Sequence, residues 1–189
     1  MSKLRTVLIS CAMAVVPMVA QADAPKAHSA LKGHPNLIKA EKELINASNA
    51  ITKSQEANEC VFGLEGGHGA DAKKQIDAAY QQVYDAAEYI NTHADECKGL
   101  KPPAEKPKKE AAPKAHGALK GHPNLLKAEK SLVAAWNAIA KSQQANECVF
   151  GLEGGHGAKA KEAINVAFKQ VYDAGEYVNT HAKECVKKK

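Results

Sequence analysis

The chain has 189 residues and a formal net charge of +5, with 26 Lys and Arg against 21 Asp and Glu. A basic balance normally suggests a nucleic-acid partner. Here residues 98–114 carry six Lys against two Glu, and the last three residues are all Lys. Because this charge lies in a linker and a tail and not on a helix face, we expect no nucleic-acid partner.

The first residues have the pattern of a secretory signal peptide. Lys3 and Arg5 are followed by an apolar run, and Ala20-Gln21-Ala22 matches a small-x-small cleavage site. The run is too short and wrongly flanked for a membrane-spanning helix. We therefore expect a signal peptide at 1–22 and export to a bacterial periplasm. No later apolar run approaches spanning length, so we expect no membrane insertion.

The rest of the chain is a tandem repeat. Residues 24–97 align with 112–185 without a gap and differ at 18 of 74 positions. The segment between them, KGLKPPAEKPKKEAAP, is rich in Pro, Lys, Glu and Ala and has no apolar period, which is typical of an extended linker. We expect the first repeat at 23–97, the linker at 98–113, and the second repeat with its basic tail at 114–189.

Each repeat contains two stretches of helical periodicity. Pro35 is placed to start the first helix. Apolar residues then recur at steps of three and four, at Leu37, Ala40, Leu44, Ala47 and Ile51, and again at Ala72, Ile76, Ala79, Val83, Ala86 and Ile90. Glycines interrupt the chain between the two stretches, at Gly63, Gly66, Gly67 and Gly69. The pattern predicts an all-α protein in which each repeat is a helical hairpin.

A two-helix hairpin of this size buries one face and is marginally stable alone. We therefore expect the two hairpins to pack as an antiparallel four-helix bundle. Trp136 stands where the first repeat has Ser48, and a large residue opposite a small one is typical of complementary packing between two copies. Two separate hairpins on the long linker are the alternative.

Four cysteines lie in the repeats. A helix of about 24 residues is roughly 36 Å long, and Cys60 lies at the turn end of its hairpin while Cys97 lies at the far end. Disulfide formation needs Cα atoms within about 7 Å, so these two cannot pair. In a bundle the pairs that can meet are Cys60 with Cys148 and Cys97 with Cys185. In an exported chain we expect them to be bridged.

All eight histidines lie in the repeats, near predicted helix ends. His68 belongs to the loop NECVFGLEGGHGA, residues 58–70, which recurs letter for letter at 146–158. We expect His93 and Cys97 to lie at i and i+4 on one face of the second helix, a spacing that suits two ligands of one metal. We expect His68 and His156 to face each other across the turns, with Glu65 and Glu153 as additional oxygen ligands. The opposite end of the bundle, with His34, His93, His122 and His181, should bind metal independently. The predicted metal ligands are His68, His156, His34, His93, His122 and His181.

Simpler interpretations exist for the same residues. His34 and His122 could cap their helices, His68 could be a solvated turn residue, and His93 could be a helix-end histidine favoured by the helix dipole. The chain has no C-x-x-C, H-E-x-x-H or C-x-x-C-H spacing, no phosphate loop and no paired E-x-x-H. No nucleophile–base pair or paired carboxylate can be argued, so we expect the protein not to be an enzyme.

Several motifs resemble those of the periplasmic small metal-binding protein family. They are His34-Pro35-Asn36-Leu37, Gly66-Gly67-His68, the periodic apolar pattern from Ile76 to Tyr89, and Asn91-Thr92-His93, with a matching set 88 residues later. The resemblance covers both repeats and implies a helical bundle that binds divalent metal. We therefore expect a protein that buffers or sequesters copper, nickel or zinc. The alternative is a structural or interaction module stapled by disulfides.

Overall fold

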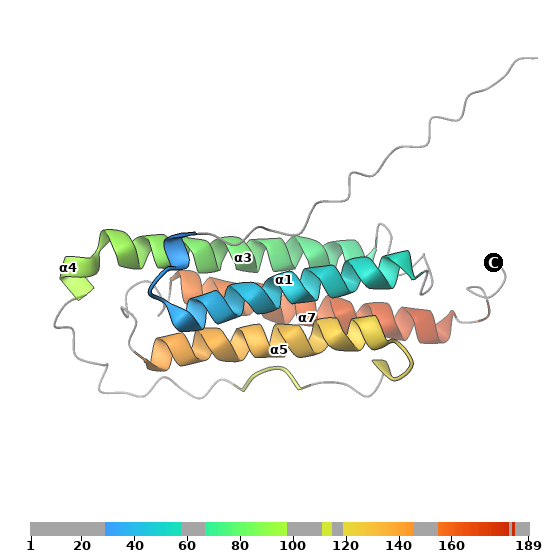
Figure 1. The fold of residues 1–189 in the computed structure, drawn as a ribbon. Helices are drawn as coiled ribbons and strands as arrows, with labels where there is room; N and C mark the ends of the chain where they lie inside the picture. Colours follow the sequence, from blue (N-terminus) through green and yellow to red (C-terminus); the bar gives the residue numbers. More distant parts are fainter. Residues whose placement is uncertain are drawn as a thin grey trace, which may run out of the picture.

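The computed structural model describes residues 29–57, 67–97, 111–114, 119–145, 155–181 and 183, with Ser29 and Cys97 described in their backbone alone. These residues form four long helices and no strand. The long helices are α1 (Pro35–Glu56), α3 (His68–Thr92), α5 (Pro123–Gln144) and α7 (His156–Thr180). Figure 1 shows them side by side in one bundle, which confirms the all-α prediction.

Two short helices flank the first hairpin. A 3-10 turn, η1 (Ser29–Leu31), precedes α1, and α4 (Ala94–Cys97) follows α3. None of the helices in the described ranges is both long and apolar enough to cross a membrane. The predicted signal peptide, 1–22, and most of the predicted linker, 98–113, lie outside the described residues.

The predicted apolar stripes form the core. Every residue of the two stripes of the first repeat is buried, and so are their equivalents in the second. Many of these buried residues are alanines, whose small side chains allow helix backbones to approach closely. The four helices share one continuous apolar cluster, which includes Tyr80, Trp136 and Phe168. Neither hairpin therefore has a core of its own.

The turn before each first helix is built in the same way in both repeats. Gly33 and Gly121 have φ of 99° and 101°, a left-handed conformation that glycine adopts without steric cost. The preceding leucine in each turn, Leu31 or Leu119, is buried against the core. A Cβ on Gly175 would lie 2.1 Å from Leu119 Cδ2, so Leu119 would have to shift to admit the alanine found at the equivalent position, Ala87.

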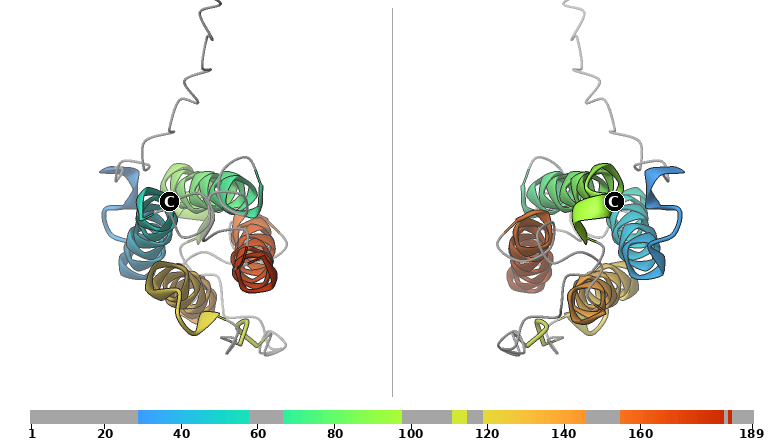
Figure 2. Two further views of the ribbon diagram at one scale, coloured as in Figure 1. Left: turned by 90° about the vertical axis from the view of Figure 1, so that its right-hand side faces the viewer. Right: turned by 90° about the vertical axis from the view of Figure 1, so that its left-hand side faces the viewer.

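The order of helices around the bundle is α1, α3, α7, α5 (Figure 2). The most extensive contacts join α1 to α5 and α3 to α7, whereas the two helices of one hairpin share a smaller contact. Figure 1 shows that α1 and α5 run in opposite directions, as do α3 and α7. Every neighbouring pair is therefore antiparallel, and the main packing is between repeats.

The two hairpins consequently point in opposite directions. The end of α1 and the end of α5, which lead into the two glycine loops, lie at opposite ends of the bundle (Figure 1). Chain length permits this, because the 25 residues from Cys97 to His122 span at most roughly 80–90 Å when extended. A helix of 22 residues is about 33 Å long.

This direction removes the basis of the predicted Cys60–Cys148 and Cys97–Cys185 pairs. That pairing required both turns to lie at one end of the bundle, and this premise is wrong. Apolar periodicity buries the right faces in either arrangement, so it does not tell how two hairpins are laid on each other. Cys60, Cys148 and Cys185 lie outside the described residues, and the side chain of Cys97 does too.

Candidate functional site

His34 and His122 occupy the N-cap positions of α1 and α5, but neither side chain caps its helix. Each Nε2 instead lies 3.1 Å from an asparagine Oδ1, of Asn91 for His34 and of Asn179 for His122. Asn91 Nδ2 donates to the carbonyl oxygen of Ala30 at 2.7 Å, which fixes the amide with Oδ1 toward the ring. His34 Nε2 therefore carries the hydrogen, and Nδ1 keeps a lone pair.

His93 and His181 follow the last residues of α3 and α7. Each ring stacks on a tyrosine four residues earlier, with centroids 4.1 Å apart for Tyr89–His93 and 4.0 Å apart for Tyr177–His181. Nδ1 of each ring lies 2.9 or 3.0 Å from the carbonyl oxygen of the same tyrosine. A carbonyl can only accept, so Nδ1 carries the hydrogen and Nε2 keeps the lone pair.

The helix is interrupted at His93. α3 ends at Thr92 and α4 begins at Ala94, and His93 between them has φ −111° and ψ 25°. The prediction placed His93 and Cys97 on one face of a single helix. That prediction is wrong, because the non-helical residue separates the two positions.

His68 and His156 begin α3 and α7, and each contacts the opposite repeat. His68 Nδ1 lies 2.8 Å from Gln170 Oε1, and His156 Nδ1 lies 3.0 Å from Gln82 Oε1. The two contacts exchange equivalent residues, as across a two-fold axis. They also show that His68 and His156 do not face each other. Gln170 stands 14 residues after His156, about 21 Å along α7.

The described histidines therefore divide equally between the two ends of the bundle. We call pole A the end with the starts of α1 and α7 and the end of α3, and pole B the end with the starts of α3 and α5 and the end of α7 (Figure 1). Pole A holds His34, His93 and His156, and pole B holds His68, His122 and His181. The predicted grouping was wrong, because it placed His68 with His156, and these two residues lie at opposite poles.

The described side chains do not form a closed metal centre. Within the described ranges, no three His, Cys, Asp or Glu residues lie close enough together to hold a metal ion. Glu65 and Glu153, predicted as oxygen ligands, lie outside these ranges, and so do His28 and His116. The arrangement offers separate imidazoles at each pole.

The partners that orient the rings were not predicted from the sequence. They are Asn91, Gln82 and Tyr89, with their equivalents in the second repeat. A usable signal was present, because all three are identical in both repeats while the neighbouring position 81 changes from Gln to Lys. Gln82 and Gln170 stand on the outer sides of the helical stripes, where apolar periodicity gives no information.

Comparison of the chain with protein-family models, with curated proteins and with solved structures found no match. The resemblance to the small metal-binding protein family therefore stays a prediction from the motifs.

Proposed function

We propose that this protein binds divalent transition metal in the bacterial periplasm, buffering or sequestering copper, nickel or zinc through imidazoles at both poles. The single observation that supports it most is the hydrogen bonding of the imidazole rings. Each of the six described histidines has one ring nitrogen directed at an oxygen acceptor. The other nitrogen of each ring has no hydrogen-bond partner among the described residues.

This is the arrangement that metal-binding histidines need. A ligating imidazole is neutral, and its second nitrogen usually donates to a carbonyl, amide or carboxylate oxygen that fixes tautomer and orientation. Imidazole nitrogen suits copper, nickel and zinc. The poles lack a third clustered ligand among the described side chains, so we expect one or two imidazoles per ion with water completing the shell. Such sites, completed by water, suit a protein that buffers metal ions.

The same contacts favour one alternative, a structural module. His68–Gln170 and His156–Gln82 join the two hairpins directly, so the rings could serve the fold alone. Substitution by glutamine separates the two functions, because an amide retains a hydrogen-bond donor but offers no imidazole nitrogen.

Calorimetric titration of the mature, oxidised protein with Cu(II), Ni(II) and Zn(II) tests the proposal. The variants H34Q/H93Q/H156Q and H68Q/H122Q/H181Q each empty one pole and serve as controls for each other. We expect each to lose one class of site and to retain the other, with the helical spectrum unchanged. A parent protein that binds none of the three metals would contradict the proposal and favour the structural module.

The ring tautomers give a test that needs no metal. Two-bond ¹H–¹⁵N correlation spectra of the neutral rings should show Nδ1–H for His68, His93, His156 and His181. The same spectra should show Nε2–H for His34 and His122. The opposite tautomer at several rings would remove the observation on which the proposal rests.

A further inference from the structure

The His156–Gln82 and His68–Gln170 contacts are equivalent in sequence but have different charges behind them. At pole A, Gln82 Nε2 also donates to Asp85 Oδ2 at 3.4 Å. Because a carboxylate can only accept, this bond turns Gln82 Oε1 toward the ring. Asp85 Oδ2 itself lies 3.8 Å from His156 Nδ1. A carboxylate, an amide and an imidazole thus form one connected chain.

Among the described residues, no lysine or arginine is paired with Asp85. Its other oxygen, Oδ1, accepts a hydrogen bond from Gln81 Nε2 at 2.8 Å, and an amide donor brings no formal charge. The side chains of His156 and Asp85 are 32% and 29% exposed, so water screens their interaction in part. His156 Nε2, on the other side of the ring, remains the nitrogen for a cation.

At pole B the equivalent carboxylate is paired with a lysine. Position 169 is Lys where position 81 is Gln, and Lys169 Nζ lies 2.6 Å from Asp173 Oδ2. Across the described ranges, Gln170 makes no hydrogen bond to Asp173 that would correspond to the Gln82–Asp85 bond. The ring of His68 therefore has its glutamine partner but no free carboxylate behind it.

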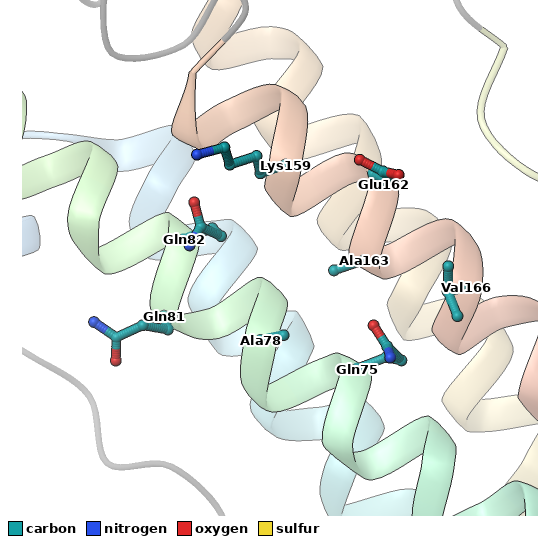
Figure 3. Close-up of a pocket in the computed structure, with 8 residues that line it drawn as sticks. All are labelled: Gln75, Ala78, Gln81, Gln82, Lys159, Glu162, Ala163 and Val166. Carbon is teal, nitrogen blue, oxygen red and sulfur yellow. The ribbon is translucent and has the colours of Figure 1, made fainter.

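Two exposed charges act in the opposite sense. Lys159 stands three residues after His156, and Asp71 stands at the equivalent position after His68. Lys159 faces Gln82 across a shallow groove of about 380 Å³ between α3 and α7 (Figure 3). Neither residue contacts a histidine ring, and exposed charges at such positions contribute little. The direct Asp85–His156 contact should dominate.

We infer that the two poles are unequal cation sites, and that the first divalent metal binds at His156 because Asp85 backs its ring. Asp85 acts as a positioning residue, which orients the imidazole through Gln82 and adds negative charge near the bound cation. Position 81/169 sets the difference between the poles. This inference rests on the proposed metal binding and names the order in which its sites fill.

Exchanging the residues at positions 81 and 169 between the two repeats tests this inference. Q81K gives pole A the lysine of pole B, and K169Q gives pole B the glutamine of pole A. Cu(II) is titrated into each protein, and broadening of backbone signals is followed at Tyr89 and His156 for pole A and at Tyr177 and His68 for pole B. In the parent, pole A should broaden first. In Q81K the affinity of pole A for Cu(II) should fall about tenfold, the lower end of the range seen when a residue that orients a metal ligand is lost.

K169Q should raise the affinity of pole B toward that of pole A, and the double variant Q81K/K169Q should reverse the order. Equal filling of both poles in the parent, or an unchanged order in the double variant, would overturn the inference while leaving metal binding intact. Absence of Cu(II) broadening at either pole would overturn both the inference and the proposed function.

A measurement without metal tests the connected chain itself. The side-chain amide of Gln82, held between Asp85 and His156, should exchange its hydrogens with solvent several-fold more slowly than that of Gln170. The difference should shrink in D85N. Equal exchange of the two amides in the parent would show that Asp85 does not hold Gln82 in place.

Discussion

The two repeats have the same histidines with the same hydrogen-bond partners, but their core residues differ. Six described histidines and their Asn, Gln and Tyr partners are identical in both copies, whereas the core differs at Ser48/Trp136, Tyr80/Phe168 and Ala87/Gly175. A homodimer of one hairpin would place two copies of the same residue at each point of its two-fold axis. Because both hairpins belong to one chain, a large residue can be combined with a small one, and one pole can differ from the other.

The opposite directions of the two hairpins determine which cysteines can pair. The ends of α1 and α7 both lie at pole B, and the ends of α3 and α5 both lie at pole A, in each case on helices diagonally across the bundle. Cys60 follows Ala57 by three residues, and Cys185 follows His181 by four. We therefore predict Cys60–Cys185 and Cys97–Cys148 in the oxidised protein. Each bridge closes a long loop and should stabilise the fold by about 3–5 kcal/mol.

Non-reducing peptide mapping identifies these pairs, and thermal unfolding with and without reductant measures their contribution. Recovery of Cys60 linked to Cys148 would show that the hairpins point in the same direction, contrary to the structure.

The second prediction concerns the asymmetric core. Trp136 on α5 is buried, with Lys161 Nζ 5.0 Å from its ring centroid, and Ser48 on α1 is buried as well. W136S should destabilise the protein by about 3–5 kcal/mol, because it leaves a cavity. Since α1 packs along α5 in opposite directions, the exchange variant S48W/W136S should recover a large part of this loss. A double variant no more stable than W136S would show that the two positions do not complement each other.

The smallest predicted change in stability comes from a hydroxyl that one repeat has and the other lacks. Tyr80 Oη donates to Glu41 Oε1 at 3.1 Å inside the bundle, and Phe168 replaces Tyr80 in the second repeat. Y80F should cost about 1–3 kcal/mol, because it removes a hydrogen bond to a buried carboxylate. Chemical denaturation near pH 8 measures the difference.

The same contact should depend on pH. Burial, and then the hydrogen bond from Tyr80 to Glu41, raise the pKa of the Tyr80 phenol well above its ordinary value. The fold favours the protonated phenol, so its contribution is complete below the ordinary tyrosine pKa of about 10 and is lost as the pH rises above it. Y80F should therefore lose less stability between pH 9 and 11 than the parent. Y84F is the control, because Tyr84 is only half-buried and its phenol pKa is raised mainly by a hydrogen bond to Glu88. Y84F should have the smaller effect, and an equal effect of both variants would contradict the role of burial.

The fold was predictable from the sequence because alternating steps of three and four mark the buried faces directly. Leu37, Leu44, Ile76 and Val83 all lie in the core as expected. The direction of one hairpin against the other was not predictable, since both arrangements bury the same faces. That single unknown decided which histidines share a pole.

Parts of the site were predictable for a related reason. Helix-start and helix-end signals placed His34 and His68 near helix termini, which is where they lie. Their hydrogen-bond partners depend on helix pairing between repeats, as with His68 and Gln170. Local sequence carries no information on such a contact, 102 residues apart along the chain.

His68 and His156 lie at opposite poles, and each contacts a glutamine of the other repeat. Nuclear Overhauser contacts of the ring protons in the parent protein test this arrangement most directly. The His68 ring should contact the side chain of Gln170, and the His156 ring should contact the side chains of Gln82 and Tyr89, whose ring centroid lies 6.5 Å away. A contact between the rings of His68 and His156 would instead place both glycine loops at one end of the bundle and show that the hairpins point in the same direction.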